Sequence, residues 1–363
     1  MQKIGKCYVE HPINKFFLVI SFSPFFYLLE TNLYFSLFYT RIMKIFVTRK
    51  LLEPGLELLR KEHELEVFPY DRVPTKEEII LGVKGKDGLL CLLSDPIDAE
   101  VINAEPNLKM IANYAVGYDN IDLKTATKKK IPVSNTPGVL TDATAEMTWA
   151  LIFSVARHVV EADKFTRAGK FKGWGPMLML GQGVTNKTLG IVGAGRIGEA
   201  FALKSKGFKM NILYVDDRVN TILEKELGAK KVELVKLLKE SDYISLHVPL
   251  TKETYHLIGE KELKMMKKNA ILINTSRGPV VYEKALVKAL KEKWIFGAGL
   301  DVYEHEPKIS EDLKKLDNIV LQPHSASATF ESRTNMAIMA AKNMLAGLKG
   351  EKPPNCVNPE IFK

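Results

Sequence analysis

Short apolar runs alternate with amphipathic stretches along most of the chain. From Met43 onward, many runs rich in Ile, Leu and Val end in Gly, Pro, Asn or Asp, which is typical of buried strands, and the apolar positions between them recur at helical spacing. We expect strands at 43–48, 65–70, 87–94, 109–116, 131–138, 188–195, 211–217, 243–250, 270–276, 295–303 and 319–324. Such alternation predicts an α/β fold with two doubly wound, Rossmann-like units, each with a mostly parallel sheet, and a cleft between them.

The pattern also predicts where the two units meet. The alternation pauses at a long helical stretch, about 142–168, and at the Gly/Pro-rich loop that follows it, and it resumes at Thr188. A final helix is expected over 330–348. We expect one domain from 43–142 plus 329–363 and a second from 143–328, since chain reversals of this kind are common in proteins that close on a ligand.

Residues 1–42 differ in character from the rest of the chain. The run Phe16–Tyr39 is crowded with Phe and Tyr and is compatible with a signal peptide or a membrane span, but Pro24 and the polar Glu30–Asn32 divide it into short pieces. We interpret these residues as an upstream extension from a misassigned start codon, outside the fold. A membrane anchor is the alternative, and we expect no stable membrane association.

Composition limits the class of protein. The chain has 363 residues, 46% of them hydrophobic, and its 52 basic and 43 acidic residues are interspersed, so we expect a soluble protein with no nucleic-acid partner. The cysteines Cys7, Cys91 and Cys356 show no metal-ligand spacing. We therefore expect no metal site and a reducing, cytoplasmic location.

A glycine loop follows the strand expected at 188–195. Gly193, Gly195 and Gly198 form G-x-G-x-x-G between a strand and a helix, the context in which this motif binds the pyrophosphate of a dinucleotide. The next strand ends in Asp216, which is placed to accept hydrogen bonds from the adenosine ribose and to repel a ribose phosphate. The sequence therefore predicts an NAD-binding domain at 143–328, while Arg218 keeps NADP as an option.

Three ionisable residues follow successive strands of this second unit. Arg277, Glu306 and His324 all come at carboxyl ends of strands, the edge at which α/β sheets bind ligands. Transfer of hydride to a ketone leaves an alkoxide that needs a proton, which an imidazole supplies near neutral pH. A carboxylate beside the imidazole favours its protonated form, and a guanidinium binds a substrate carboxylate.

Each of these residues also has a simpler interpretation. Arg277 could form only a structural ion pair with Glu306, and His324 could cap a turn. Glu304 or His305 could act in place of Glu306. These alternatives stay open from the residues alone.

Several segments together resemble the D-isomer-specific 2-hydroxyacid dehydrogenase family, and within it the glyoxylate/hydroxypyruvate reductases. The resemblance covers nearly everything from Met43 onward. The matching segments are NYAVGYDNIDL, GIVGAGRIG, LHVPLTKETYHLI, ILINTSRGPVV, GAGLDVYEHEP and LQPHSASAT. One departure is Ala326, which stands where the family usually has Gly.

The resemblance implies an activity and roles for particular residues. It implies reduction of a small 2-oxo acid, glyoxylate or hydroxypyruvate first, with Arg277 binding the substrate carboxylate, His324 as acid/base and Glu306 as its partner. Backbone amides at Val116 and Gly117 would help to hold the carboxylate. The remaining expected contacts are Asp301 to the nicotinamide amide, Leu93 and Ser94 to the substrate, and Arg196, Ile197, Pro249, Thr254, Thr275 and Ser276 to the cofactor.

The resemblance also implies a homodimer, built largely through residues 142–185, in which Trp174 reaches the neighbouring subunit's site. Plain dimer packing is the alternative role for Trp174. Rival functions are a phosphoglycerate or D-lactate-type dehydrogenase of the same family, a non-enzymatic NAD-sensing protein like the corepressors of this fold, and a protein tethered through residues 16–39.

Overall fold

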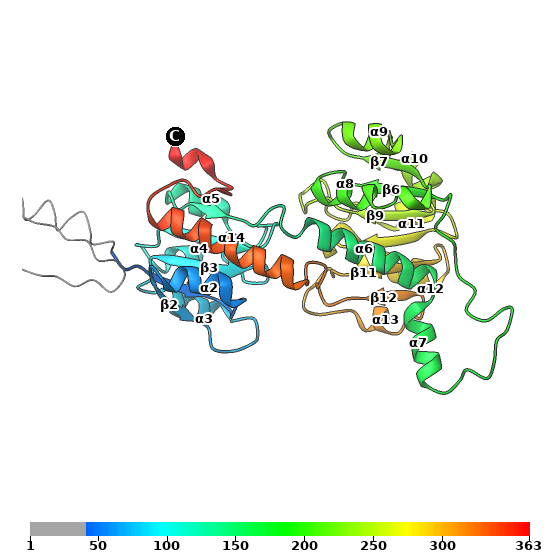
Figure 1. Ribbon diagram of the computed structural model, residues 1–363, viewed down its shortest axis with the longest axis horizontal. Helices are drawn as coiled ribbons and strands as arrows, with labels where there is room; N and C mark the ends of the chain where they lie inside the picture. The colour runs from blue at the N-terminus through cyan, green and yellow to red at the C-terminus, as the bar shows by residue number, and fades with distance from the viewer. Residues whose placement is uncertain (1–40) are drawn as a thin grey trace, which may run out of the picture. The chain divides into compact units, whose positions relative to one another are not determined.

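The computed structural model describes residues 41–363. Within this range the strands form a 5-stranded sheet, in the order β2-β1-β3-β4-β5, and a 7-stranded sheet, in the order β12-β11-β10-β9-β6-β7-β8 (Figure 1). Every strand pairing is parallel. Both sheets belong to one compact unit, Met43–Lys363. The predicted α/β, doubly wound class is confirmed, whereas the interpretation of residues 1–40, including the run at 16–39, lies outside the described residues.

The first sheet is apolar at its centre and polar at one edge. Its strands are β1 (Lys44–Val47), β2 (Glu64–Val67), β3 (Gly88–Leu92), β4 (Met110–Tyr114) and β5 (Val133–Ser134). The central strands β3 and β4 are buried on both faces, as expected for parallel strands with helices on both sides, whereas the edge strand β2 carries two exposed glutamates. Strand β5 is shorter than the predicted 131–138, because the backbone N–H of Thr136 already bonds the loop carbonyl of Ala115.

The C-terminal helix packs on the first sheet. The helices around this sheet are α2 (Glu53–Arg60), α3 (Lys76–Val83), α4 (Ala99–Asn103), α5 (Leu123–Lys128) and α14 (Phe330–Leu348). Thr75 caps α3 as predicted, in a reciprocal capping box with Glu78. Helix α14 lies alongside α2 and against β4 (Figure 1), so the end of the chain completes the core begun by its first strands.

The second sheet carries an apolar core on each face. Its strands are β6 (Thr188–Val192), β7 (Asn211–Val215), β8 (Lys230–Lys231), β9 (Tyr243–Leu246), β10 (Ile271–Asn274), β11 (Gly297–Leu300) and β12 (Ile319–Leu321). Its helices are α6 (Thr141–Ala156), α7 (Val159–Arg167), α8 (Arg196–Leu203), α9 (Thr221–Leu227), α10 (Leu234–Glu240), α11 (Glu260–Met265), α12 (Glu283–Lys291) and α13 (Glu311–Lys314), with short 3-10 turns at Lys206–Phe208 and Gly278–Val280. A third 3-10 turn, Pro359–Phe362, follows α14 beside the first sheet. Strand β8 was not predicted, because its two exposed lysines give no apolar signal.

The long helix predicted at 142–168 is wrong as a single element. It breaks between α6 and α7 at His158, whose φ of 53° is left-handed. The carbonyl of Ala156 accepts a hydrogen bond of 2.7 Å from the backbone N–H of Gln182, so the returning loop uses a group that a continuous helix would need. No helix within residues 41–363 is long and apolar enough to cross a membrane.

Candidate active site

The glycine loop joins β6 to α8 and leaves an open face. Gly193 has a φ of +94°, and a Cβ there would lie 2.8 Å from the backbone carbon of His247. A Cβ on Gly198 would lie 2.1 Å from the carbonyl oxygen of Gly193, so the helix could not approach the strand as closely. A Cβ on Gly195, by contrast, would meet nothing within 4 Å. Gly193 therefore serves the turn and Gly198 the packing of helix on strand, whereas Gly195 leaves space for a ligand.

This open face belongs to a hollow of about 740 Å³. The hollow is bounded by loops at the carboxyl ends of strands from both sheets. The predicted site residues that line it are Leu93, Val116, Gly117, Gly195, Arg196, Ile197, Pro249, Thr275, Ser276, Arg277, Asp301 and His324. Because the first backbone N–H groups of α8 have no partner within their helix, Gly195, Arg196 and Ile197 fit the phosphates of a dinucleotide.

Asp216, at the end of β7, is tied to the glycine loop. Its Oδ2 accepts a hydrogen bond of 2.8 Å from the backbone N–H of Ala194, and its Oδ1 accepts one of 3.0 Å from that of Arg218. The carboxylate thus fixes the loop in addition to any contact with a ribose, a role that the sequence did not indicate.

His324 and Glu306 form a close pair at the edge of the second sheet. The Nδ1 of His324 lies 2.8 Å from the Oε2 of Glu306, and the other carboxylate oxygen accepts a hydrogen bond of 2.9 Å from the backbone N–H of Tyr303. A carboxylate can only accept, so Nδ1 carries a proton and Nε2 is left for the hollow that His324 lines. Glu304 is engaged elsewhere, with His256 at 2.8 Å, so Glu306 is the acid that meets His324.

The ionisation of Glu306 follows from its surroundings. Partial burial by itself would raise the pKa of Glu306, but the hydrogen bond and the positive charge of His324, with the Tyr303 N–H and the charge of Arg277, outweigh it and hold that pKa below its ordinary value. The carboxylate is therefore available to stabilise a protonated imidazole.

Asp301, buried at the end of β11, holds the segment that carries His324. Its carboxylate accepts hydrogen bonds from the backbone N–H groups of Ser325 at 2.7 Å and Ala326 at 2.9 Å, and its carbonyl accepts one from the N–H of His324 at 2.9 Å. Burial raises the pKa of Asp301, although the two N–H groups oppose this. These bonds support the left-handed backbone of His324, whose φ is 54°.

Arg277 pairs with a carboxylate from the loop that follows β4, and not with Glu306. Its Nε lies 3.1 Å from the Oδ1 of Asp119, and its Nη1 donates to the carbonyl of Ser276 at 2.9 Å. A Cβ on Gly117 would lie 1.7 Å from Nη2, so only glycine admits the guanidinium at this point. Nη2 of Arg277 therefore lies against Gly117, in the loop whose backbone amides were expected to hold a substrate carboxylate.

Other predicted residues lie outside the hollow. The hydroxyl of Ser94 accepts a hydrogen bond from Arg49 at 2.5 Å, and the hydroxyl of Thr254 donates one of 2.6 Å to the carbonyl of Pro249. Thr254 thus supports the loop that carries a lining residue. Trp174 is 86% exposed and lies in the loop after α7.

Asp119 and His247 are among the residues of the hollow that sequence reasoning missed. Asp119 lies within NYAVGYDNIDL, two positions after Gly117, and that position was the available signal. His247 lines the hollow below the glycine loop, where burial lowers its pKa to about 3 and its Nε2 lies 2.9 Å from the Ser245 hydroxyl. The imidazole of His247 is therefore neutral at physiological pH. Nothing in the sequence signalled its place in the hollow, because a single His at the end of a strand is not part of a recognisable motif.

Comparison with known proteins gives consistent results. The profile of the NAD binding domain of D-isomer specific 2-hydroxyacid dehydrogenases matches residues 149–326. The chain is 55% identical over 323 residues to a glyoxylate reductase of Thermococcus litoralis, covering 88% of this chain and 98% of that protein. It is 56% identical over 322 residues to one of Korarchaeum cryptofilum, with 88% and 97% covered. A solved NADPH-dependent glyoxylate/hydroxypyruvate reductase of Sinorhizobium meliloti, in complex with NADP and malonate, has a TM-score of 0.77 at 30% identity and covers 87% of this chain and 97% of its own.

Proposed function

Because the chain belongs to the D-isomer-specific 2-hydroxyacid dehydrogenase family and is an NAD(P)-dependent oxidoreductase, we propose that it reduces glyoxylate to glycolate or hydroxypyruvate to D-glycerate. The observation that carries this proposal is the convergence on one hollow of the glycine loop, Arg277 and the His324–Glu306 pair. Relatives named glyoxylate reductase support this choice of substrate.

Arg277 receives the substrate carboxylate. Its Nη2 lies against Gly117, and the neighbouring backbone of Val116 and Gly117 lines the same hollow. A guanidinium binds a carboxylate through charge-assisted hydrogen bonds and polarises the adjacent carbonyl. Since Nε and Nη1 are held by Asp119 and Ser276, the fork is already oriented before substrate arrives.

His324 supplies the proton. A reduced nicotinamide, when bound, provides the hydride. The oxygen of the reduced carbon then takes a proton from Nε2 of His324, and the ionised Glu306 stabilises the imidazolium before the transfer and fixes the ring throughout. Asp301 keeps His324 in place through the backbone, and its carboxylate is also the group that we propose to hold the nicotinamide amide.

NAD is the cofactor, with NADP also accepted. The contacts that we propose for it come from Asp216 and from the lining residues Gly195, Arg196, Ile197, Pro249, Thr275 and Ser276. Gly193, Gly198 and Thr254 act on the cofactor site by holding the loops that carry these residues. The carboxylate of Asp216 at the end of β7 favours an unphosphorylated ribose, while the exposed Arg218 beside it is a cation that suits a phosphate.

The proposal includes an arrangement of domains and subunits. The substrate domain comprises 43–142 and 329–363, and the cofactor domain 143–328. The loop after α7 exposes Phe171, Trp174 and Met177, an apolar set that suits the interface of a homodimer. We propose that Trp174 reaches the neighbouring subunit's site from there.

The test is an oxidation assay with NADH and with NADPH against glyoxylate, hydroxypyruvate, pyruvate, 2-oxobutyrate and phenylpyruvate. We expect glyoxylate or hydroxypyruvate to give the highest kcat/KM, with NADH preferred. If NADH binds, by quenching of its fluorescence, yet none of the five acids accelerates its oxidation, the protein is a binding protein and the proposal is wrong.

A further inference from the structure

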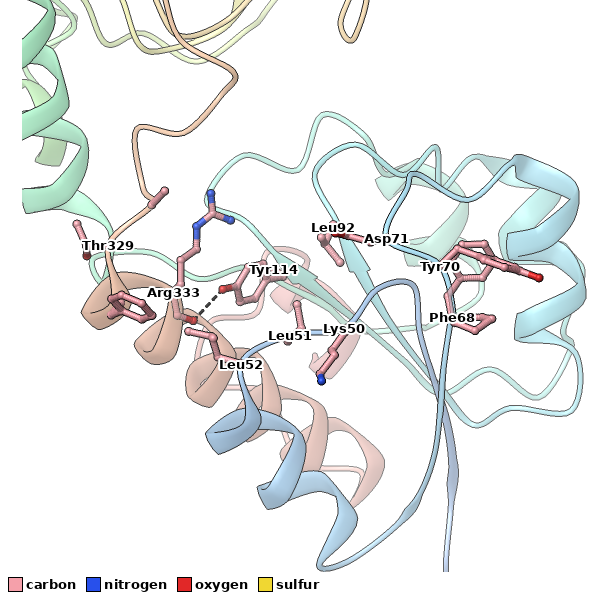
Figure 2. A pocket seen from close by; sticks show the side chains of 13 residues that line it. Lys50, Leu51, Leu52, Phe68, Tyr70, Asp71, Leu92, Tyr114, Thr329 and Arg333 are labelled. Atoms are coloured by element: carbon pink, nitrogen blue, oxygen red, sulfur yellow. Dashed lines mark hydrogen bonds between the residues drawn. The ribbon is translucent and has the colours of Figure 1, made fainter.

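A second hollow, of about 650 Å³, lies at the carboxyl edge of the first sheet. Its walls come from the loops that follow β1 and β2, from the ends of β3 and β4, and from the start of α14 (Figure 2). They include Leu51, Phe68, Leu92, Tyr114 and Phe330, so most of the lining is apolar.

This hollow adjoins the candidate active site along three segments of chain. In each of Leu92–Leu93, Tyr114–Ala115 and Ser327–Ala328, one residue lines the second hollow and its neighbour lines the first. The walls of the two hollows are therefore continuous at β3, at β4 and in the segment that leads from His324 into α14. A molecule held at Arg277 can reach this space only if its carbon chain extends beyond the reacting carbon.

The second hollow also holds a cation without an ion-pair partner. Arg333 is half-buried, and within residues 41–363 its guanidinium forms no ion pair. Its backbone carbonyl accepts a hydrogen bond from the hydroxyl of Tyr114 at 2.8 Å, which fixes the backbone of this turn (Figure 2). Burial raises the pKa of that hydroxyl, although the charge of Arg333 and a hydrogen bond with its side chain oppose this, so the neutral Tyr114 is the neighbour of the guanidinium. Arg49 at the same sheet edge differs, since it is paired with Asp95 at 3.3 Å.

The charged residues that line the second hollow, Lys50, Asp71 and Arg333, have a net positive charge. The side chain of Lys50 is 78% exposed, and its Nζ lies 4.0 Å from the Oε1 of Glu53. Asp71 lines the same hollow, but it is exposed in the loop after β2. A guanidinium beside apolar walls suits an anionic group at the end of a short carbon chain, because Arg binds a carboxylate through its planar fork.

Glyoxylate has no carbon beyond its oxo carbon and would leave this space empty. We propose that the second hollow is a side-chain subsite of the active site, which takes the distal carboxylate of 2-oxo dicarboxylic acids, with Arg333 as the residue that recognises it. The inference rests on the proposed function, because the 2-oxo group must still be held at Arg277 and His324.

The test compares two 2-oxo acids of similar length, 2-oxoglutarate with its distal carboxylate and the uncharged-tail 2-oxohexanoate. We expect the wild-type enzyme to have the higher kcat/KM for 2-oxoglutarate. Arg333→Gln should lower the ratio of the two kcat/KM values about tenfold, which is typical of one charge-assisted hydrogen bond. Lys349→Gln, which removes a cation paired with Glu62 just beyond the other end of α14, is the matched control and should leave the ratio unchanged.

The outcomes separate the two proposals. If no 2-oxo acid is reduced, the proposed function itself fails. If glyoxylate is reduced but the ratio is the same in Arg333→Gln and in the wild type, or if 2-oxohexanoate is preferred, the dicarboxylate subsite is wrong and the proposed function stands. Should Arg333→Gln not fold, inhibition of the wild-type enzyme decides: glutarate should inhibit glyoxylate reduction more strongly than hexanoate, and equal inhibition overturns the inference.

Discussion

His324, the proposed proton donor, and Arg277, the proposed binder of the substrate carboxylate, are held in place in different ways. His324 and its partner Glu306 both follow strands of the second sheet, and their pairing needs only that sheet. Arg277 also follows a strand of the second sheet, but its ion pair is with Asp119, in a loop of the first. The His324–Glu306 pair is therefore positioned by one sheet, whereas the position of Arg277 depends on residues that follow strands of both sheets.

The two arrangements also differ in strength. The His324 segment is held by a carboxylate that is fully buried, Asp301, through backbone hydrogen bonds. The Arg277–Asp119 pair, with side chains 23% and 41% exposed, is about as open to water as the His324–Glu306 pair, at 25% and 31%, so the difference lies in the buried Asp301 and not in the two pairs. Exposed ion pairs contribute at most about 1 kcal/mol, so the second arrangement can be broken at little energetic expense. Substitutions at His324, Arg277 and Asp119 test this difference.

Replacement of the proton donor should have the largest effect. His324→Ala removes the acid at the carbonyl oxygen, and kcat for glyoxylate should fall by roughly two to four powers of ten, the range for a lost general acid. NADH affinity, measured by fluorescence titration, should hardly change. Glu306→Gln is the companion variant and should lower kcat less, because His324 remains. A kcat near that of the wild type in His324→Ala would falsify the assignment of the proton donor.

Replacement of the carboxylate receiver should act mainly on KM. Arg277→Ala leaves the His324–Glu306 pair in place on the second sheet, so the KM for glyoxylate should rise about a hundredfold, the scale of a lost charge-assisted contact. Binding of NADH should be nearly the same. The measurement is steady-state kinetics over a wide range of glyoxylate concentrations. Unaltered kinetics would show that the carboxylate binds elsewhere in the hollow.

A feature of the fold or of the site could be predicted from the sequence when the residues that determine it are close together along the chain. The glycine loop and α14 were predicted well because period, turn residues and motif are local signals. The convergence of Arg277, Glu306 and His324 followed from one rule, that parallel strands end at the same edge. The pairing of Arg277 with Asp119 could not be predicted, because the two are 158 positions apart and belong to different sheets.

Two further failures have the same physical origin. The break at His158 is caused by a loop that returns to bond Ala156, and no residue near the break is a Gly or Pro that would signal it. The second hollow is assembled from loops after several strands and from the start of the last helix, so the sequence around Arg333 does not indicate a site there. Where a tertiary contact decides the outcome, the local pattern carries no information about it.

Loss of the partner of Arg277 should have the smallest effect. Asp119→Asn keeps the shape of the loop but removes the charge that holds Nε, so the guanidinium loses orientation and the KM for glyoxylate should rise only about two- to fivefold, in keeping with a solvent-exposed pair. The rise should shrink as salt is added, because screening already weakens the pair in the wild type. Asp142→Asn, which breaks another exposed pair, with Lys204, is the matched control and should leave KM as it is. A lower KM in Asp119→Asn would instead mean that Asp119 competes with the substrate carboxylate for Arg277. In that case Asp119 occupies the carboxylate-binding site and does not support it.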